Sequence, residues 1–236
     1  MPNLIDSEPG VILHTRPYKE HSLLVELYTL NYGRVSAVAR VSKKSSSHSI
    51  GIYQPFILLK LSLRQGSSAL WNLTDAYMQR VAFKIEPPRS FSATYLNELL
   101  YYLIKTHDSE PRLFAAYIKT LESLEKGMQE VVCLRDFEST LIETLGYAID
   151  YSVSDVGDIK SDEHYYFSVN NGFIKALKEE SNTFSGQDLL NIHQHNLKDK
   201  NTQLALKKIN KSVIDELLQG RELKSRLLYQ QFMAVK

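Results

Sequence analysis

The 236-residue chain contains one cysteine, Cys133, and this scarcity excludes a disulfide-stabilised fold. A single thiol cannot form an internal disulfide, so the composition favours a reducing cytoplasm. Long apolar runs are missing too, because no segment approaches the roughly 20 residues that a membrane-spanning helix needs. Met1–Pro9 holds two acidic residues and no basic one, which argues against a secretory signal peptide. With 43% apolar and 23% charged residues, the composition is that of a globular protein.

Motifs for metal binding are also lacking. A zinc ribbon needs four ligands, usually thiolates in paired Cys-x-x-Cys units. The only cysteine falls in a predicted helix, and His164 stands alone. His193 and His195 are two positions apart, so they would not share one face of a helix. The sequence therefore predicts no metal site, and these histidines are expected at the surface near turns.

Catalytic motifs are absent as well. The sequence has neither a Gly-x-Ser-x-Gly nucleophile elbow nor a Gly-x-x-x-x-Gly-Lys-Ser/Thr phosphate loop. Cys133 lies in a helical apolar pattern, where a buried and inert thiol is the commoner outcome. The acidic residues are scattered, and no pair for acid–base catalysis can be recognised. We therefore expect no catalytic residue, no cofactor and no enzymatic activity.

The net charge of +1 hides an asymmetry along the chain. Residues 1–82 hold nine lysines and arginines against five aspartates and glutamates, a net charge of +4. The remainder holds 19 against 22, a net charge of −3. This difference is a weak indication that the first third binds an anionic ligand.

The first 80 residues have the pattern of five short strands joined by turns. In Arg34–Arg40, Val35, Ala37 and Ala39 alternate with more polar residues and would share one face. A longer excursion, Val41–Tyr53, has too little apolar content to pack and is expected to be mobile. Five strands with one long excursion are typical of a closed barrel of the OB type. The predicted strands are Val11–Leu13, Leu23–Thr29, Arg34–Arg40, Phe56–Arg64 and Ala69–Tyr77.

The β pattern stops at Pro87-Pro88, and helical periodicity follows. We expect a multidomain α+β protein: an OB-fold barrel at 1–82, then a helical domain at 83–236 with a small zinc-free hairpin inserted at about 150–185. The hairpin would pair Tyr165–Val169 with Phe173-Ile174 across an Asn-Asn-Gly turn. The first predicted helix carries an apolar stripe of Phe91, Tyr95, Leu99 and Leu103. Further helices are expected at about 111–125, 129–146, 204–219 and 223–233.

The expected barrel has the composition of a nucleic-acid-binding module. Cations can follow phosphates while aromatic rings stack on bases at about 1–3 kcal/mol each. Three of the aromatic residues, Tyr28, Phe56 and Trp71, could equally fill the barrel core. The aromatic residues are Tyr18, Tyr28, Tyr32, Tyr53, Phe56 and Trp71. The candidate DNA-binding cations are Arg16, Lys19, Arg34, Arg40, Lys43, Lys44 and Arg64. A purely structural role is harder to assign to Arg34, Arg40, Lys43 and Lys44.

Several short motifs resemble the RecO family, the bacterial recombination and repair mediators. They keep the order and spacing of the family from about residue 10 to 233, nearly the whole chain. In the expected barrel they are His14–Leu24, Tyr32–Arg40 and Gln54–Phe56. In the helical part they are Tyr95–Leu100, Leu134–Glu138, Leu145–Tyr147 and Gly220–Arg226.

The resemblance implies a DNA mediator with an N-terminal OB fold and a C-terminal helical domain. Such a protein binds single- and double-stranded DNA and anneals complementary strands. It works with RecR and helps to load RecA onto strands coated by single-stranded-DNA-binding protein (SSB), in the cytoplasm at the nucleoid. Many family members have a four-cysteine zinc site after the Leu145-Gly146-Tyr147 segment, but Asp150–Gly172 contains no cysteine. We expect the hairpin to persist without the metal, with Tyr165, Phe167 and Phe173 packed on helices.

Family members also bind the acidic C-terminal tail of SSB on the helical domain. The resemblance assigns this contact to Arg135, whose guanidinium can hold a terminal carboxylate through paired hydrogen bonds. An ordinary helical ion pair with Asp136 or Glu138 is the alternative. Tyr95 and Leu99 would line the adjoining apolar pocket, or they belong to the core. An RNA-binding OB protein, a pure assembly scaffold and a nuclease remain as other functional classes.

Overall fold

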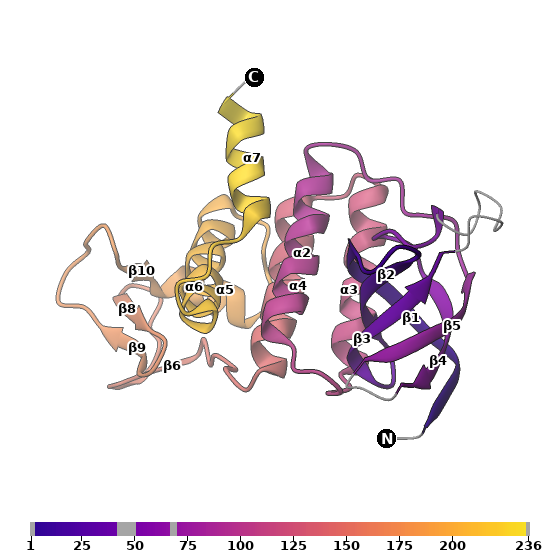
Figure 1. Cartoon of the computed structure of the whole chain (residues 1–236). Helices are drawn as coiled ribbons and strands as arrows, with labels where there is room; N and C mark the ends of the chain where they lie inside the picture. The colour runs from indigo at the N-terminus through magenta and orange to yellow at the C-terminus, as the bar shows by residue number, and fades with distance from the viewer. Residues whose placement is uncertain (1–2, 42–50, 67–69, 235–236) are drawn as a thin grey trace. The chain divides into compact units, whose positions relative to one another are not determined.

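The computed structural model describes residues 3–41, 51–66 and 70–234. The chain forms two compact units, drawn in Figure 1. The first contains residues 1–128 together with 223–236, and the second contains Gln129–Glu222. The boundaries of these units differ from those of the expected domains, 1–82 and 83–236. The reason is that two helices after the barrel, and the last helix of the chain, pack with the barrel unit.

The first unit is built on a closed five-stranded barrel with the strand order β1-β2-β3-β5-β4. β3 and β5 are parallel, whereas the other neighbours are antiparallel. This topology confirms the predicted OB-type fold, and closure pairs each strand with a neighbour on both sides. The strands are β1 Leu4–Pro17, β2 Ser22–Thr29, β3 Gly33–Arg40, β4 Leu59–Gln65 and β5 Trp71–Met78.

Apolar side chains from every strand fill the barrel interior. On β3, Val35, Ala37 and Ala39 are buried and the residues between them are more exposed, as their alternation predicts. Trp71 and Leu73 continue this core on β5. The remaining core residues are Ile5, Ile12, Val25, Leu27, Ile57, Leu59, Leu61 and Leu63.

A register shift changes the orientation of the second half of β5. Leu63 pairs with Leu73, but the preceding residue Ser62 pairs with Asp75, so Thr74 is the extra residue of a β-bulge. The bulge reverses the alternation, and Ala76 packs against the barrel core. Asp75 and Tyr77 are therefore exposed.

Two helices of the same unit cover the outer face of β1 and β2. They are α2 (Arg89–Leu103) and α3 (Pro111–Glu125), which stand beside the barrel in Figure 1. The ring of Tyr28 on β2 lies 5.5 Å from that of Phe114 on α3, between ring centres. Asn97 Nδ2 on α2 donates to the Leu13 carbonyl at 3.1 Å. Every residue of β2 from Leu24 to Thr29 is therefore buried, one set inside the barrel and the other beneath the helices.

Helix α2 is buried on more than one side. Two members of the predicted stripe, Phe91 and Tyr95, are half-buried, whereas Ala93, Leu96 and Leu100 outside the stripe are fully buried. Phe91 packs on the last helix, α7 (Lys224–Ala234), with its ring centre 5.2 Å from that of Phe232. The apolar stripe thus predicted the helix correctly, but it did not predict the second buried face that contains Ala93, Leu96 and Leu100.

The carboxylate of Glu98 anchors the start of α7. It accepts hydrogen bonds from the backbone N–H groups of Lys224, at 3.1 Å, and Ser225, at 2.9 Å, and from the Ser225 hydroxyl. A negative group at this position satisfies free backbone donors and interacts favourably with the helix dipole. Two of the segments that resemble the RecO family, Tyr95–Leu100 and Gly220–Arg226, therefore contact one another through Glu98 and Ser225.

The second unit combines three helices with a small sheet of order β10-β8-β9-β6-β7. The predicted hairpin is present as β8 and β9. The structure also contains a short helix, α5, that the sequence pattern did not predict. The helices are α4 Glu130–Thr144, α5 Gly186–His193 and α6 Lys200–Leu218. The strands are β6 Val153–Ser154, β7 Gly157–Asp158, β8 His164–Ser168, β9 Gly172–Lys175 and β10 Phe184–Ser185.

Aromatic packing and a polar network hold the small sheet in place. Tyr165 and Phe173 are buried with residues of α5 and α6, and Phe167 packs against the same cluster. This agrees with the packing expected from the sequence. The Tyr165 hydroxyl accepts from the Lys160 N–H at 2.8 Å and donates to Glu163 at 3.0 Å. Glu163 also forms an ion pair with Lys175 Nζ at 2.6 Å.

Candidate nucleic-acid interface

Three of the candidate cations gather at one end of the barrel. Arg16 is near the end of β1, Lys19 is in the turn between β1 and β2, and Arg40 ends β3. Register brings them together, because Arg40 pairs with Ser22 at the start of β2 and Arg16 pairs with Leu24. All three side chains are exposed. Two further candidates, Lys43 and Lys44, lie outside the residues that the structure describes.

Arg34 has a structural role that its sequence position did not suggest. Its Nη1 lies 3.1 Å from Glu26 Oε2, and its Nε donates to the Ile104 carbonyl at 3.1 Å. The guanidinium also lies 5.3 Å from the ring centre of Tyr101 on α2. These contacts join β3 to the end of α2. They also neutralise much of the positive charge of Arg34, so less of it is available to attract a phosphate.

Arg64 lies on a different part of the barrel surface, the outer face of β4 and β5. It pairs with Asn72 on β5, which pairs in turn with Val38 on β3. Cross-strand partners in a sheet point to the same side, so Arg64, Asn72 and Val38 form one row on the outside. Arg40 is two residues beyond Val38 on the same face.

Most of the candidate aromatic residues serve the fold. Tyr28 and Trp71 are buried, the first beneath α3 and the second in the barrel core. Tyr32 and Tyr53 are half-buried against that core. The backbone of Phe56 is left-handed, with φ of 67°, and its side chain is half-buried. Tyr18 is also half-buried, and Lys19 Nζ lies 5.4 Å from its ring centre.

Sequence reasoning missed two exposed residues on the outer face of β4 and β5, Lys60 and Tyr77. They are direct cross-strand partners. Lys60 alternates with buried Leu59 and Leu61, so the strand pattern could have assigned it to the outside. Tyr77 could not be assigned in this way because the bulge at Thr74 changes the alternation before it.

Two carboxylates of the barrel, Glu8 and Glu26, are buried. Glu8 is buried and accepts hydrogen bonds from the backbone and side-chain N–H groups of Asn31, at 2.6 and 3.0 Å. Glu26 is buried beside Arg34 and accepts from the Ser36 hydroxyl at 2.9 Å. These two negative charges are used inside the unit, and so is the charge of Arg34, which pairs with Glu26. On the described barrel surface five exposed cations then stand against three exposed carboxylates, Asp6, Glu20 and Asp75.

Arg135 belongs to the second unit and is held by an internal ion pair. Its Nη2 lies 2.7 Å from Glu138 Oε1, and both side chains are buried. Asn210 on α6 donates to Ser139 at 3.2 Å beside this pair. The Nε of Arg135 is buried without a hydrogen-bond partner among the described residues. The alternative of a helical ion pair with Glu138 is therefore realised, and one guanidinium N–H remains unsatisfied.

The two residues proposed to line the pocket beside Arg135 lie in the first unit. Leu99 is fully buried, which agrees with the alternative of core packing. Tyr95 is half-buried, and the guanidinium of Arg226 on α7 lies 5.5 Å from its ring centre. Each residue thus has a packing role within its own unit.

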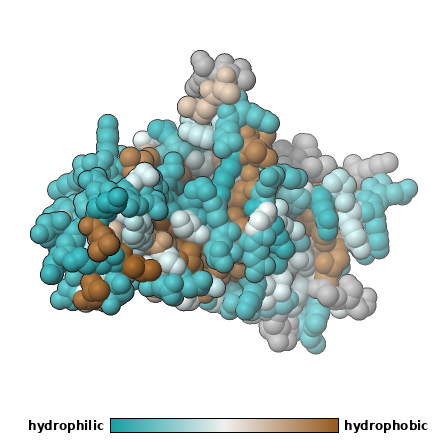
Figure 2. Space-filling view, turned by 90° about the vertical axis from the view of Figure 1, so that its left-hand side faces the viewer, coloured by the Kyte–Doolittle hydropathy of each residue, from teal (hydrophilic) through white to brown (hydrophobic). Residues whose placement is uncertain are grey.

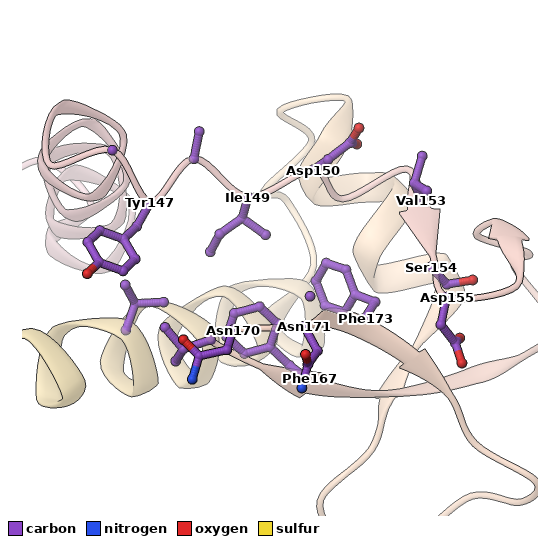
Figure 3. Close-up of a pocket in the computed structure, with 15 residues that line it drawn as sticks. Tyr147, Ile149, Asp150, Val153, Ser154, Asp155, Phe167, Asn170, Asn171 and Phe173 are labelled. Carbon is purple, nitrogen blue, oxygen red and sulfur yellow. The ribbon is translucent and has the colours of Figure 1, made fainter.

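A cavity of about 500 Å³ opens in the second unit between the segment after α4 and the small sheet. In Figure 3, Ile149, Phe167 and Phe173 point toward its centre, whereas the carboxylates of Asp150 and Asp155 point away. Ser152 donates to Asp150 through its N–H and its hydroxyl, which lowers the pKa of that carboxyl. The face of the molecule drawn in Figure 2 is mainly hydrophilic, with several small apolar patches. The cavity offers apolar walls without a converging set of polar groups.

Two absences concern the described part of the chain. Among residues 3–41, 51–66 and 70–234, no group of three or more histidine, cysteine, aspartate or glutamate side chains is arranged to hold a metal ion. Over the same residues, no helix has the length and apolar character that crossing a membrane requires.

Comparison with known proteins identifies the family. The model for the N-terminal part of recombination protein O matches residues 4–79, and the model for its C-terminal part matches residues 86–227. The chain belongs to the RecO family. The RecO match covers the whole barrel and continues through the helices that follow it as far as the first turn of α7. Membership in this family supports a role in DNA repair and recombination.

Individual RecO proteins are similar over nearly their full length. The DNA repair protein RecO of Tolumonas auensis is 35% identical over 232 residues, 97% of each chain. That of Psychromonas ingrahamii is 34% identical over 95% of this chain and 98% of its own. That of Methylococcus capsulatus is 32% identical over 97% of this chain and 94% of its own. The RecO fold expected from the sequence motifs is therefore confirmed.

Proposed function

We propose that this chain is a non-enzymatic recombination mediator that binds single- and double-stranded DNA and anneals complementary strands. With RecR, it promotes the loading of RecA on single strands coated by SSB. The observation that carries the proposal is the group of Arg16, Lys19 and Arg40 at one end of the barrel, in a chain that matches the RecO family over most of its length. Lys43 and Lys44, which follow Arg40 in the sequence, are proposed to contact DNA as well.

The mechanism requires only electrostatics and positioning. Two DNA strands that approach one another repel through their phosphates, and a cation cluster that contacts both reduces this repulsion. Each phosphate contact releases counterions, so it contributes about 0.9 to the slope of log K against log salt for duplex DNA. No cofactor or metal is needed for such a step, and we place the protein in the cytoplasm at the nucleoid.

Recruitment to SSB-coated strands is proposed to use Arg135. Its Nε–H has no hydrogen-bond partner among the described residues, and a carboxylate of the tail would satisfy this donor after the side chains that bury it move aside. The ion pair with Glu138 holds the guanidinium in a fixed orientation before the ligand arrives.

An annealing assay with two complementary labelled strands, each with and without SSB, tests the proposal. The wild-type protein should accelerate duplex formation on bare and on SSB-coated strands. Arg16→Glu with Arg40→Glu should lose this acceleration, whereas Lys207→Glu with Lys211→Glu on α6 serves as a charge-matched control. Absence of annealing with all partners present would indicate a scaffold, and tighter binding of RNA than of DNA of equal length would indicate an RNA-binding protein. Degradation of DNA with added magnesium or manganese would indicate a nuclease.

A further inference from the structure

Tyr77 is the most exposed of the 14 tyrosines, with 65% of its surface accessible. It lies on β5, in a barrel whose other large apolar side chains are mostly buried inside or beneath helices. An exposed aromatic ring on a rigid strand loses little entropy on binding and presents a flat apolar face. Its position therefore needs an explanation beyond packing.

The backbone fixes the outward direction of Tyr77. Alternation from Trp71 and Leu73 alone would place residue 77 inside the barrel. The extra residue Thr74 reverses the alternation, and its hydroxyl donates to the Ser62 carbonyl at 3.0 Å on the neighbouring strand. β-Bulges of this kind commonly redirect a side chain toward a functional surface.

Cations accompany Tyr77 on the same face. Lys60 is its direct cross-strand partner, and Arg64 lies four residues further along β4. Direct partners have Cβ atoms about 4.5–5.5 Å apart, so the Lys60 amine can reach the edge of a ligand that covers the ring. Arg40 lies one strand beyond β5, in the row next to that of Asn72 and Arg64. All three cations are exposed.

Two carboxylates share this face, and each has a local partner. The Tyr77 hydroxyl lies 3.5 Å from Asp75 Oδ1, and the Ser62 hydroxyl donates to Asp6 Oδ1 at 2.6 Å. The face therefore has three cations and two anions, which is less basic than the barrel end with Arg16 and Lys19. A ligand held here needs the aromatic ring as well as the charges.

We infer that the outer face of β4 and β5 binds single-stranded DNA, with Tyr77 stacked on a base and Lys60 at an adjacent phosphate. The inference rests on the proposed function, since it assigns the single-strand contact of that mediator. Bases in a duplex are already stacked and cannot cover the ring, so Tyr77 distinguishes single strands from duplexes. The cations at the barrel end contact phosphates in both forms.

Binding of a fluorescent oligothymidylate and of a duplex of equal length, measured by anisotropy, tests the inference. Tyr77→Ala should weaken oligothymidylate binding by about 5- to 150-fold, the effect of one stacked base. Duplex affinity should stay within about twofold of wild type, because phosphate contacts dominate it. Tyr77→Phe keeps the ring and should retain single-strand affinity. Tyr147→Ala, which removes another exposed tyrosine in the second unit, is the matched control.

Two additional measurements separate stacking from other effects. On an abasic oligonucleotide of the same length, wild type and Tyr77→Ala should bind equally. Lys60→Gln should lower the salt slope for the single strand by about 0.7, the value for one phosphate contact. Unchanged single-strand affinity of Tyr77→Ala, or an equal loss for the duplex, would overturn the inference while the proposed function stands. Failure of the wild type to bind either DNA would instead overturn the proposed function.

Discussion

Arg34 and Glu26 form a half-buried ion pair across neighbouring strands, with Nη1 3.1 Å from Oε2. The pair lies where the end of α2 meets the barrel, since the same guanidinium donates to the Ile104 carbonyl. Arg40 is six residues further along β3 and is exposed. Two arginines on one face of one strand therefore have different roles, and this difference can be measured.

Arg34→Ala should destabilise the first unit while Arg40→Ala should not. Removing Arg34 leaves the buried Glu26 carboxylate without its cation, at a cost of about 1.5–3 kcal/mol in the free energy of unfolding. An exposed substitution such as Arg40→Ala typically changes it by less than about 0.5 kcal/mol. Urea unfolding gives both values, and a salt titration of duplex binding should show a lower slope for Arg40→Ala. Equal unfolding energies for the two variants would contradict the structural role of Arg34.

Arg135 should affect both stability and the binding of an acidic tail peptide. Arg135→Ala leaves the Glu138 carboxylate buried and unpaired, which costs about 3–5 kcal/mol. Arg135→Lys keeps the charge and should be less destabilising, but it lacks the planar fork that holds a carboxylate. We expect Arg135→Lys to weaken binding of a peptide with the SSB tail sequence while DNA affinity is retained. Calorimetric titration of the peptide and anisotropy with DNA measure the two effects, and a parallel loss of both would indicate misfolding.

Glu98→Ala should loosen α7 from the rest of the first unit. The substitution removes the acceptor for two backbone N–H groups and one hydroxyl, comparable to the loss of a helix cap at about 1–2 kcal/mol. Hydrogen exchange of the α7 amides should become faster, and that of the barrel strands should change little. Glu222→Ala, an exposed carboxylate just before the helix, is the control. Unchanged exchange in α7 would show that its other contacts with α2, on Phe91 and Tyr95, hold the helix without Glu98.

The second unit should lose stability at acidic pH through Glu163. Hydrogen bonding to the Lys175 amine holds the pKa of the Glu163 carboxyl below its ordinary value of 4.5. A lowered folded-state pKa means that the stabilisation is complete above pH 4.5 and is lost as the pH falls through the lowered value. Thermal unfolding of the wild type, measured from about pH 3 to about pH 7, should show this decline, because the range brackets the ordinary pKa of a glutamate. Glu163→Gln should have a flatter profile, and an identical profile would contradict the assignment.

The sequence predicted most of the barrel but not the orientation of the second half of β5. Alternation in β3 correctly placed Val35, Ala37 and Ala39 inside, because a regular strand has one fixed period. The bulge at Thr74 depends on pairing with Ser62 and has no local signal, so the exposure of Tyr77 could not be deduced. The stripe of α2 gave one packed face, whereas burial of Ala93 and Leu96 depends on contacts with distant segments.

The candidate sites were predictable only where partners are close in the sequence. The ion pair of Arg135 with Glu138 is three residues apart on one helix and was foreseen as an alternative. Arg34 and Glu26 meet through strand register, and Arg34 reaches Ile104 through tertiary packing. Neither contact can be deduced from spacing. Charge identified which residues can bind phosphate, and only the fold determines which of them are already neutralised.

The anchoring of α7 on α2 has a consequence for how the protein is made. Leu223–Lys236 completes a unit that begins at the N-terminus, and all of Gln129–Glu222 is translated in between. At roughly 5–20 residues per second, the ribosome needs on the order of 5–20 s to synthesise that intervening segment. During this interval Phe91 and Glu98 lack the α7 residues that they contact in the folded protein, and the inserted unit can complete its own fold. The second unit can therefore complete its fold on the nascent chain before the first unit, which waits for α7, is complete.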